Sequence, residues 1–208
     1  RHVFGGGFLG LDNIGVFDRS QPLPTGGHLV QADGTAWMAL YCATMLSISL
    51  ELAGHDKSYE DVATKFFEHW AAITHAINTL GGTGLWDEED GFYYDQIQED
   101  DGAERLKIRS LVGLLPICAV EVLPLGRLKE LHGFDKRMHW FLQNRKELAD
   151  RIQFTGKGDR AKALLAIPSR NQLERVLRYM LDEDEFLSPY GIRSLSKVHK
   201  DDPFIIEH

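Results

Sequence analysis

The sequence predicts an all-α fold in a single domain over residues 1–208. Two observations support this prediction: long segments whose apolar residues recur every three or four positions, and short Gly-containing loops between them. Pairs of such segments follow one another along the chain, although no internal sequence repeat is visible. Hydrophobic residues make up 43% of the chain and charged residues 26%, so a core of ordinary size can form.

The first two helices are predicted over residues 33–52 and 58–80. Apolar side chains recur through the first at helical spacing, from Trp37 to Leu52, and Gly54 then ends it. The second helix begins with a Ser-Tyr-Glu-Asp sequence similar to a capping box and ends at a pair of glycines. Two long helices joined by a short loop form an antiparallel helical hairpin.

A short β-ribbon is predicted next, over residues 85–95, because Asp90-Gly91 lies between aromatic-rich flanks. Another short strand is predicted over residues 106–110. Residues 110–125 are apolar and predict a third helix, with Pro116 suited to its first turn. These ribbons would be insertions in the otherwise helical domain.

The rest of the chain is less regular until its last helix. A short helix is predicted near Leu128 within the irregular stretch 126–168. Ser169 then caps a helix with a clear apolar face. Residues 186–194 follow an acidic turn and form a loop punctuated by Gly and Pro.

The charge and hydropathy of the chain restrict the binding partners that we expect for it. The formal net charge is −8, so neither nucleic acid nor an anionic membrane surface is an expected partner. No run approaches the roughly 18 apolar residues of a membrane span, and no secretory signal is visible. Cys42 and Cys118 lie in apolar runs and are expected to be buried thiols, which favours a cytoplasmic location. Because the chain starts at Arg1 rather than Met, we expect a piece of a longer protein.

The known nucleophile, phosphate-loop and zinc-protease motifs are absent, and the nine histidines are spread singly. No metal or cofactor is therefore expected. The remaining candidates for catalytic residues are carboxylates that lie among aromatic residues. Asp12, Asp18 and Asp33 lie in Gly-rich and aromatic sequence around the start of the first helix. Acids in such loops are candidates for proton transfer. The alternative is that Asp12 and Asp33 are a turn residue and an N-cap.

Carboxylates with aromatic side chains suit chemistry on a neutral substrate rich in hydroxyl groups. Such chemistry needs one carboxyl that holds its proton and another that is ionised. Aromatic faces and Arg donors that could hold a sugar are supplied by Trp37, Tyr41, Trp86, Phe92, Tyr93, Arg109, Tyr190 and Arg193.

Four segments in order, residues 8–20, 31–39, 85–95 and 187–194, resemble the glucosidases of glycoside hydrolase family 63, the mannosyl-oligosaccharide glucosidase type. This resemblance implies an (α/α)6 toroid of inner and outer helices, of which the chain would be an incomplete portion. It also implies an oligosaccharide substrate whose α-glucosidic bonds are hydrolysed with inversion.

The resemblance also implies roles for single residues. The family's general acid lies in a Gly-x-Asp loop, and Gly10-Leu-Asp12 matches it, which makes Asp12 the acid with Asn13 beside it. Relatives with a better-defined acid have Glu-Ser before this Gly, whereas this chain has Phe-Leu. The general base lies further along the chain in this family, so these 208 residues are expected to lack it and to be inactive alone. The residues expected to line the pocket are Asp33, Trp37, Arg109, Tyr190 and Arg193.

Two other functions stay open. A sugar epimerase or polysaccharide lyase would use His or Tyr as its base, with His28 and His199 as candidates. A non-catalytic helical module would bind a saccharide or a protein partner instead. An incomplete toroid would expose the apolar helix faces that its missing helices cover, and it is expected to self-associate through them. Asp18 and Asp33 also remain alternatives to Asp12, although Asp18 and Arg19 could form a local ion pair.

Overall fold

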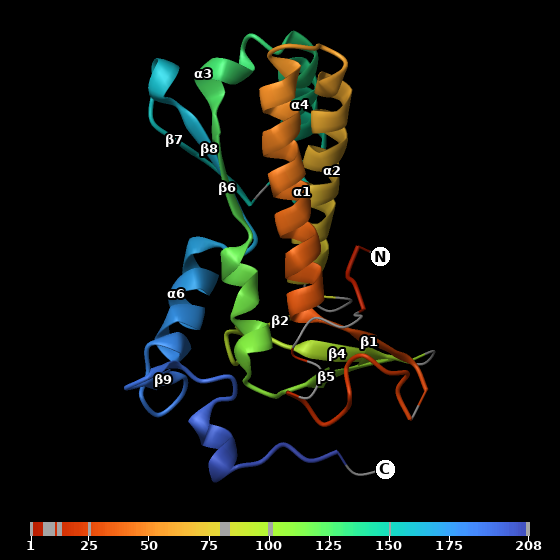
Figure 1. Ribbon diagram of the computed structural model, residues 1–208, viewed down its shortest axis with the longest axis vertical. Coiled ribbons are helices and arrows are strands. Elements are labelled where there is room, and N and C mark those ends of the chain that lie inside the picture. Colours follow the sequence, from red (N-terminus) through yellow and green to blue (C-terminus); the bar gives the residue numbers. More distant parts are fainter. Residues whose placement is uncertain are drawn as a thin grey trace. The chain divides into compact units, whose positions relative to one another are not determined.

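The structure is a computed structural model that describes residues 2–5, 11, 14–24, 26–79, 84–99, 102–149 and 151–206. Within these ranges, helices alternate with four small antiparallel sheets (Figure 1). The prediction of an all-α toroid is therefore wrong, and the described chain is a mixed α/β structure. Each of the described strands has only two to five residues, so none of them produces a long alternating pattern in the sequence.

The chain divides into two compact units. The first comprises Arg1–Ala36, Ile77–Pro116 and Pro168–His208, and the second comprises Trp37–Ala76 and Ile117–Ile167. Helix α1 (Ala32–Ala53) begins in the first unit and continues in the second. Each unit is therefore assembled from segments that are distant in the sequence.

The second unit contains most of the predicted helical hairpin, α1 followed by α2 (Tyr59–Asn78). Its core includes Phe67, whose ring meets those of Phe134 and Phe141 edge-on at centroid distances of 6.0 and 5.2 Å. Both partners belong to α4 (His132–Asn144), which the sequence did not predict. The remaining short helices of this unit are α3 (Leu125–Leu128), close to the prediction near Leu128, and α5 (Lys146–Ala149).

The predicted helix over residues 110–125 is wrong. Two 3₁₀ turns, Leu111–Gly113 and Leu115–Cys118, are followed by strand β6 (Val120–Pro124). The β-branched residues of β6 favour an extended backbone, and Pro116 supplies no N–H for a longer helix. In the second unit, β6 pairs with β8 (Lys162–Ala166), which pairs with β7 (Ile152–Thr155). Cys42 is buried as predicted, but Cys118 is exposed, contrary to the prediction.

The first unit is built on a three-stranded antiparallel sheet, β1 (His28–Val30), β4 (Asp95–Gln98) and β5 (Ala103–Leu106), in the order β1-β4-β5. The predicted ribbon is confirmed as the hairpin β2 (Trp86–Asp87) and β3 (Phe92–Tyr93). Gly91 occupies its turn with a φ of +72°, a conformation that favours glycine. A second hairpin, β9 (Leu187–Ser188) and β10 (Gly191–Ile192), lies within the predicted loop.

Aromatic rings join the first hairpin to helix α6 (Arg170–Met180) in the core of the first unit. Phe92 is fully buried, with its centroid 5.5 Å from that of Tyr179 and 5.9 Å from that of Phe186. The predicted cap of α6 is confirmed, because Ser169 accepts a hydrogen bond from the backbone N–H of Gln172 in a capping box. A 3₁₀ turn, Lys197–Lys200, follows near the end of the chain.

Candidate functional site

A buried cluster of one arginine and two carboxylates lies in the first unit. Arg19 is only 5% exposed, and its Nε donates to Oδ2 of Asp95 at 2.7 Å. Its Nη1 donates to Oδ2 of Asp33 at 3.0 Å, and its Nη2 donates to the other carboxylate oxygen of Asp33. Nη1 also donates to the backbone carbonyl of Leu11 at 3.2 Å. One guanidinium therefore holds two carboxylates and the residue that precedes Asp12 in sequence.

Both carboxylates also organise the start of α1. Asp33 Oδ1 accepts from the backbone N–H of Gly34 at 2.8 Å, and Asp95 Oδ1 accepts from that of Ala32 at 2.8 Å. Burial raises the pKa of Asp95 to about 6, because the charge of Arg19 and the Ala32 N–H only partly offset the lost solvation and the nearby Asp33. The expected ion pair of Asp18 with Arg19 is not what the structure shows, since Arg19 pairs with Asp33 and Asp95 while Asp18 accepts from Ser20.

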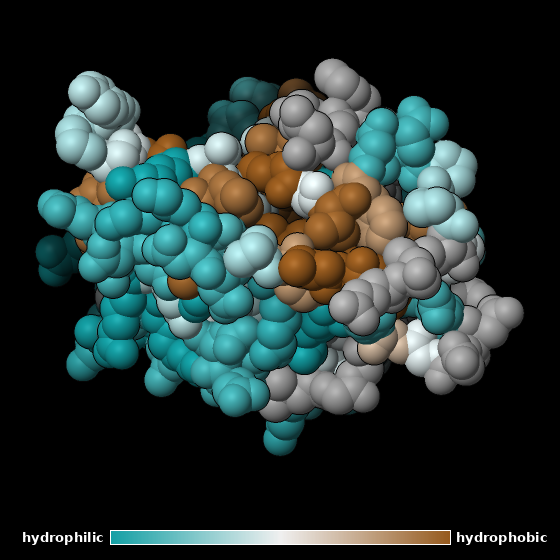
Figure 2. Space-filling model, turned by 90° about the horizontal axis from the view of Figure 1, so that it is seen from below, coloured by the Kyte–Doolittle hydropathy of each residue, from teal (hydrophilic) through white to brown (hydrophobic). Residues whose placement is uncertain are grey.

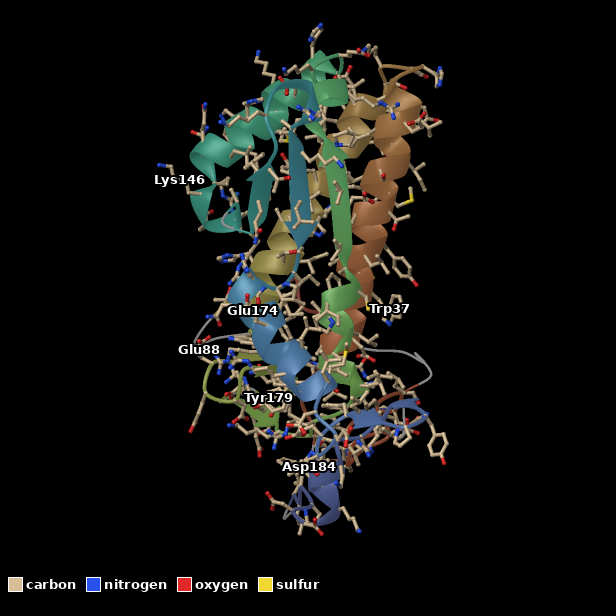
Figure 3. All side chains as sticks on the ribbon, turned by 90° about the vertical axis from the view of Figure 1, so that its left-hand side faces the viewer. Trp37, Glu88, Lys146, Glu174, Tyr179 and Asp184 are labelled. Carbon is tan, nitrogen blue, oxygen red and sulfur yellow. The ribbon has the colours of Figure 1, made fainter. Side chains whose placement is uncertain are left out.

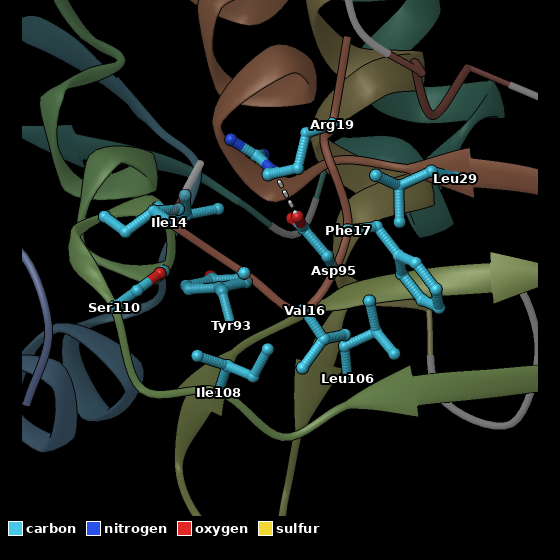
Figure 4. A pocket seen from close by; sticks show the side chains of 13 residues that line it. Ile14, Val16, Phe17, Arg19, Leu29, Tyr93, Asp95, Leu106, Ile108 and Ser110 are labelled. Carbon is cyan, nitrogen blue, oxygen red and sulfur yellow. Dashed lines mark hydrogen bonds and ion pairs between the residues drawn. The ribbon is translucent and has the colours of Figure 1, made fainter. Parts of the chain in front are cut away.

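A small cavity adjoins this cluster (Figure 4). Its volume is about 20 Å³, room for about one water molecule. Apolar side chains form most of its wall, and Asp95, Tyr93 and Ser110 add polar groups. Figure 2 shows that apolar residues also gather on the surface of the first unit seen from below. The cavity is too small for a sugar ring, so the cluster is an anchor for the surrounding backbone rather than a substrate pocket.

A larger groove of about 500 Å³ lies elsewhere on the first unit; we call it the polar groove. Asp90 comes from the β2–β3 turn, Tyr94 follows β3, and Lys107 and Arg109 follow β5. The other wall is formed by the last 3₁₀ turn and the segment after it, with Val198, His199, Asp202, Pro203, Phe204 and Ile205.

Asp90, Lys107 and Arg109 in the polar groove each form an ion pair. Asp90 Oδ2 accepts from the Tyr94 hydroxyl at 3.0 Å and lies 3.1 Å from Lys107 Nζ. Burial and the Asp90 charge raise the pKa of Tyr94, so its phenol remains a donor. The Arg109 guanidinium lies 5.1 Å from the ring centroid of Tyr179 and 3.5 Å from a carboxylate oxygen of Glu185. Figure 3 shows Tyr179 on α6, on the face of the unit turned toward the viewer.

His199 links the segment after the last 3₁₀ turn to the opposite wall of the polar groove through two hydrogen bonds. Its Nε2 accepts from the backbone N–H of Arg109 at 2.9 Å, and its Nδ1 lies 3.1 Å from the carbonyl oxygen of Asp202. Because a backbone N–H can only donate, Nε2 is unprotonated, and Nδ1 carries the proton that it donates to Asp202. Both nitrogens of the imidazole are therefore bound to backbone groups.

Of the predicted pocket residues that lie in the described part of the chain, Arg109 alone lines the polar groove. Asp33 is in the buried cluster, and Trp37 is half-buried in the second unit with its ring stacked 6.4 Å from Tyr41. Asp12 and Asn13 lie outside the described residues.

The two predicted residues near the β9–β10 hairpin have different surroundings. Tyr190 is 99% exposed at the turn of the hairpin. Arg193 Nη1 donates to the backbone carbonyls of Glu183 at 3.0 Å and Glu185 at 3.2 Å, and also to that of Leu187. This pattern stabilises the loop that leads from α6 into the hairpin.

Sequence reasoning missed most of the polar groove. Asp90 was recognised only as a turn residue, and Lys107 and Asp202 were not singled out. The contact between His199 and Arg109 joins positions 90 residues apart, which no local pattern in the sequence predicts. Among the described residues, no group of three His, Cys, Asp or Glu side chains is placed to hold a metal ion.

No family model matches the chain. The chain is 48% identical over 219 aligned positions to the uncharacterized protein YMR196W of Saccharomyces cerevisiae. The alignment covers 98% of this chain but 20% of the yeast protein, so the chain spans about a fifth of the length of this relative.

Proposed function

We propose that the chain is part of a glycoside hydrolase that cleaves α-glucosidic bonds with inversion, with Asp12 as the general acid and the polar groove as a saccharide-binding site. The polar groove is the observation that supports this proposal most. Its volume of about 500 Å³ falls within the range of small-molecule pockets. The reaction class is proposed from the resemblance of four sequence segments to family 63 glucosidases.

The charges of the polar groove favour a neutral ligand. The formal charges of Asp90 and Asp202 cancel those of Lys107 and Arg109, so neither an anion nor a cation is selected. Each sugar hydroxyl both donates and accepts, and this wall offers cationic donors beside carboxylate acceptors. Phe204 adds an apolar ring that could lie against a sugar face.

The Arg19 cluster supports a role for the Asp12 loop. Arg19 is fixed by Asp33 and Asp95 and binds the carbonyl of Leu11, so the backbone next to Asp12 is tied to a buried ion-pair network. A general acid must be positioned precisely against the leaving oxygen, and anchored backbone serves that need. The second carboxylate of an inverting pair lies about 6.5–9.5 Å from the first, and the proposal assigns it to no residue of this chain.

The contacts of His199 weigh against this residue as the base of the epimerase or lyase alternative. A catalytic base needs a nitrogen that is open to the substrate, whereas both nitrogens of His199 are bound to backbone groups. A non-catalytic saccharide-binding module would use the same groove but would not depend on Asp12. An assay of catalysis therefore distinguishes the hydrolase from the non-catalytic saccharide-binding module, whereas an assay of binding alone does not.

The experiment is glucose release from a panel of α-linked glucobioses, assayed with this chain and with the full-length yeast relative. We expect release by the longer protein, and a loss of about a hundredfold or more when the residue aligned with Asp12 is changed to Asn. The matched control changes the residue aligned with Asp18, in the same loop, to Asn and should leave turnover within a few-fold. Full activity of the first variant, or no turnover of any α-glucoside by the longer protein, would contradict the proposal.

A further inference from the structure

His199 takes the place of a backbone carbonyl where two segments of the first unit meet. The Leu111 N–H donates to the carbonyl of Ser194 at 2.8 Å. The Ser196 N–H donates to the carbonyl of Arg109, also at 2.8 Å. The Arg109 N–H is the next donor in this row, and Nε2 of His199 accepts it at 2.9 Å. An imidazole nitrogen therefore completes a row of backbone hydrogen bonds.

The segment before His199 has other anchors, whereas the segment after it depends on His199. The Lys197 N–H donates to the carbonyl of Glu185 at 3.0 Å, so the chain is held on this side of His199. Within the described residues, no backbone hydrogen bond joins residues 203–206 to another segment. Figure 1 shows these residues as the tail that follows the last turn of the chain. The bond between His199 and Arg109 is thus the last hydrogen bond that holds this wall of the polar groove.

The bond to Arg109 requires one protonation state of the imidazole. Nε2 accepts only while it carries no proton, and Nδ1 then holds the proton that it donates to the carbonyl of Asp202. A doubly protonated imidazole has two donors and no acceptor. Its Nε2–H would point at the Arg109 N–H, and neither group would have a partner. The bond from Nδ1 to Asp202 would persist, because Nδ1 donates in both states.

We propose that His199 is a pH-sensitive switch that opens the polar groove. When the imidazole takes up a second proton, its hydrogen bond with Arg109 breaks, and the wall formed by residues 198–205 separates from the wall that carries Arg109. The segment up to Ser196 stays in place, because its backbone bonds involve no titratable group. The opening does not depend on the ligand of the groove, so this proposal is independent of the proposed enzymatic function.

The charged and titratable groups around the imidazole come from several elements of the first unit. They are Lys107 and Arg109 after β5, Asp90 in the β2–β3 turn, Tyr94 after β3, Glu185 after α6, and Lys197, Lys200, Asp201 and Asp202 in the segment of His199 itself. Lys107 is paired with Asp90, and Arg109 with Glu185. Within the described residues, no carboxylate forms an ion pair with the ring of His199. The closed wall therefore offers a second proton no direct counter-charge, and uptake of that proton favours the open wall.

Asp95 also titrates in acid and has the opposite effect. Burial raises its pKa to about 6, so folding favours its protonated form, and its contribution to stability grows as the pH falls. The switch at His199 loosens the structure as the pH falls. A loss of protection at low pH that is confined to the Arg109 amide is therefore not an effect of Asp95.

The test is hydrogen exchange of the backbone amides of the 208-residue chain, measured by NMR and corrected for the intrinsic rate at each pH. We expect the protection factor of the Arg109 amide to fall at least about tenfold between about pH 7.5 and pH 5. The Leu111 amide lies in the same row and should keep its protection within a few-fold. The ¹⁵N shifts of the His199 ring report its protonation in the same samples, and the loss should follow them.

His199→Gln is the decisive variant, because the Gln side chain can accept a hydrogen bond but does not titrate. Protection of the Arg109 amide should then be independent of pH, whether or not Gln restores the bond. The matched control is His28→Gln, at an exposed position of β1, which should keep the pH dependence of the unaltered chain. Backbone ¹⁵N relaxation should show that Phe204 becomes more mobile in acid in the unaltered chain and not in His199→Gln.

Three results would overturn the proposal. The first is an Arg109 amide whose protection stays constant while the His199 ring takes up its second proton. The second is a loss of protection in acid that persists in His199→Gln, because another group would then be responsible. The third is an equal loss at the Leu111 amide, which would show that the whole contact opens rather than the wall after His199.

Discussion

Arg19 Nε donates a 2.7 Å hydrogen bond to Asp95 Oδ2, although 76 positions separate the two residues in the sequence. With Asp33, this ion pair ties the loop before β1 to the first turn of α1 and to strand β4, all within the first unit. It also ties Leu11, the neighbour of the proposed general acid, to the same network. The backbone at Leu11 is therefore held by a buried charge cluster.

Removal of the guanidinium should strongly destabilise the first unit. Arg19→Met leaves two buried carboxylates without their cation, and we expect the free energy of unfolding to fall by about 3–5 kcal/mol in urea titrations. The matched control is Arg145→Met, because Arg145 is half exposed and its pair with Glu147 should contribute at most about 1 kcal/mol. Equal losses in the two variants would contradict a special role for the cluster.

The raised pKa of Asp95 predicts a pH dependence of stability. The folded state binds this proton more tightly than the unfolded state, so the contribution of Asp95 is most favourable below about pH 4. It is lost as the pH rises toward 6. The unfolding free energy of the unaltered chain should therefore fall between pH 4 and 7 relative to Asp95→Asn, by a few kcal/mol at most. Parallel pH profiles for the two proteins would show that the carboxyl titrates normally.

His199 should hold the end of the chain against Arg109. In His199→Ala the Arg109 N–H loses its acceptor, and we expect its hydrogen exchange to speed up and proteases to cleave more readily after residue 197. His28→Ala is the control, because His28 is exposed on β1. An unchanged hydrogen-exchange rate of the Arg109 amide in His199→Ala would show that the hydrogen bond from Arg109 to His199 does not hold this segment in place.

The capping box of α6 gives a smaller and local prediction. Ser169→Ala removes the acceptor for the Gln172 N–H, and the chain should lose about 1 kcal/mol of stability. Ser169→Asp should restore most of that loss, because Asp caps helices as well as Ser does. Thermal unfolding of the three proteins measures both effects. A loss that Asp fails to restore would argue for a role of Ser169 other than capping.

The elements that sequence reasoning predicted are those set by local pattern. Helices α1 and α2 follow from apolar periodicity, α6 from the cap at Ser169, and the first hairpin from Asp90-Gly91. The sheet β6-β8-β7 was missed because its strands have four or five residues and only partly alternate between buried and exposed positions. Length and alternation together are what distinguish a strand from a short helix in sequence.

The candidate site was harder to predict than the fold. Asp33 was noticed as a carboxylate near a helix start, but its partner Arg19 lies 14 positions away, and Asp95, which also binds Arg19, lies 62 positions away. The polar groove depends on the segment around His199 returning to Arg109, a long-range contact with no local signature. Titratable side chains brought together by such contacts can be found only once the tertiary structure is known.

The measurement that tests the central claim most directly is binding of α-linked glucobioses to the 208-residue chain, followed by NMR chemical shifts. The account predicts shifts of groove residues in the unaltered chain and in Asp12→Asn, and at least tenfold weaker binding in Arg109→Met but not in Arg145→Met. Absence of binding by the unaltered chain, or equal binding by Arg109→Met, would contradict the assignment of the polar groove as a saccharide site.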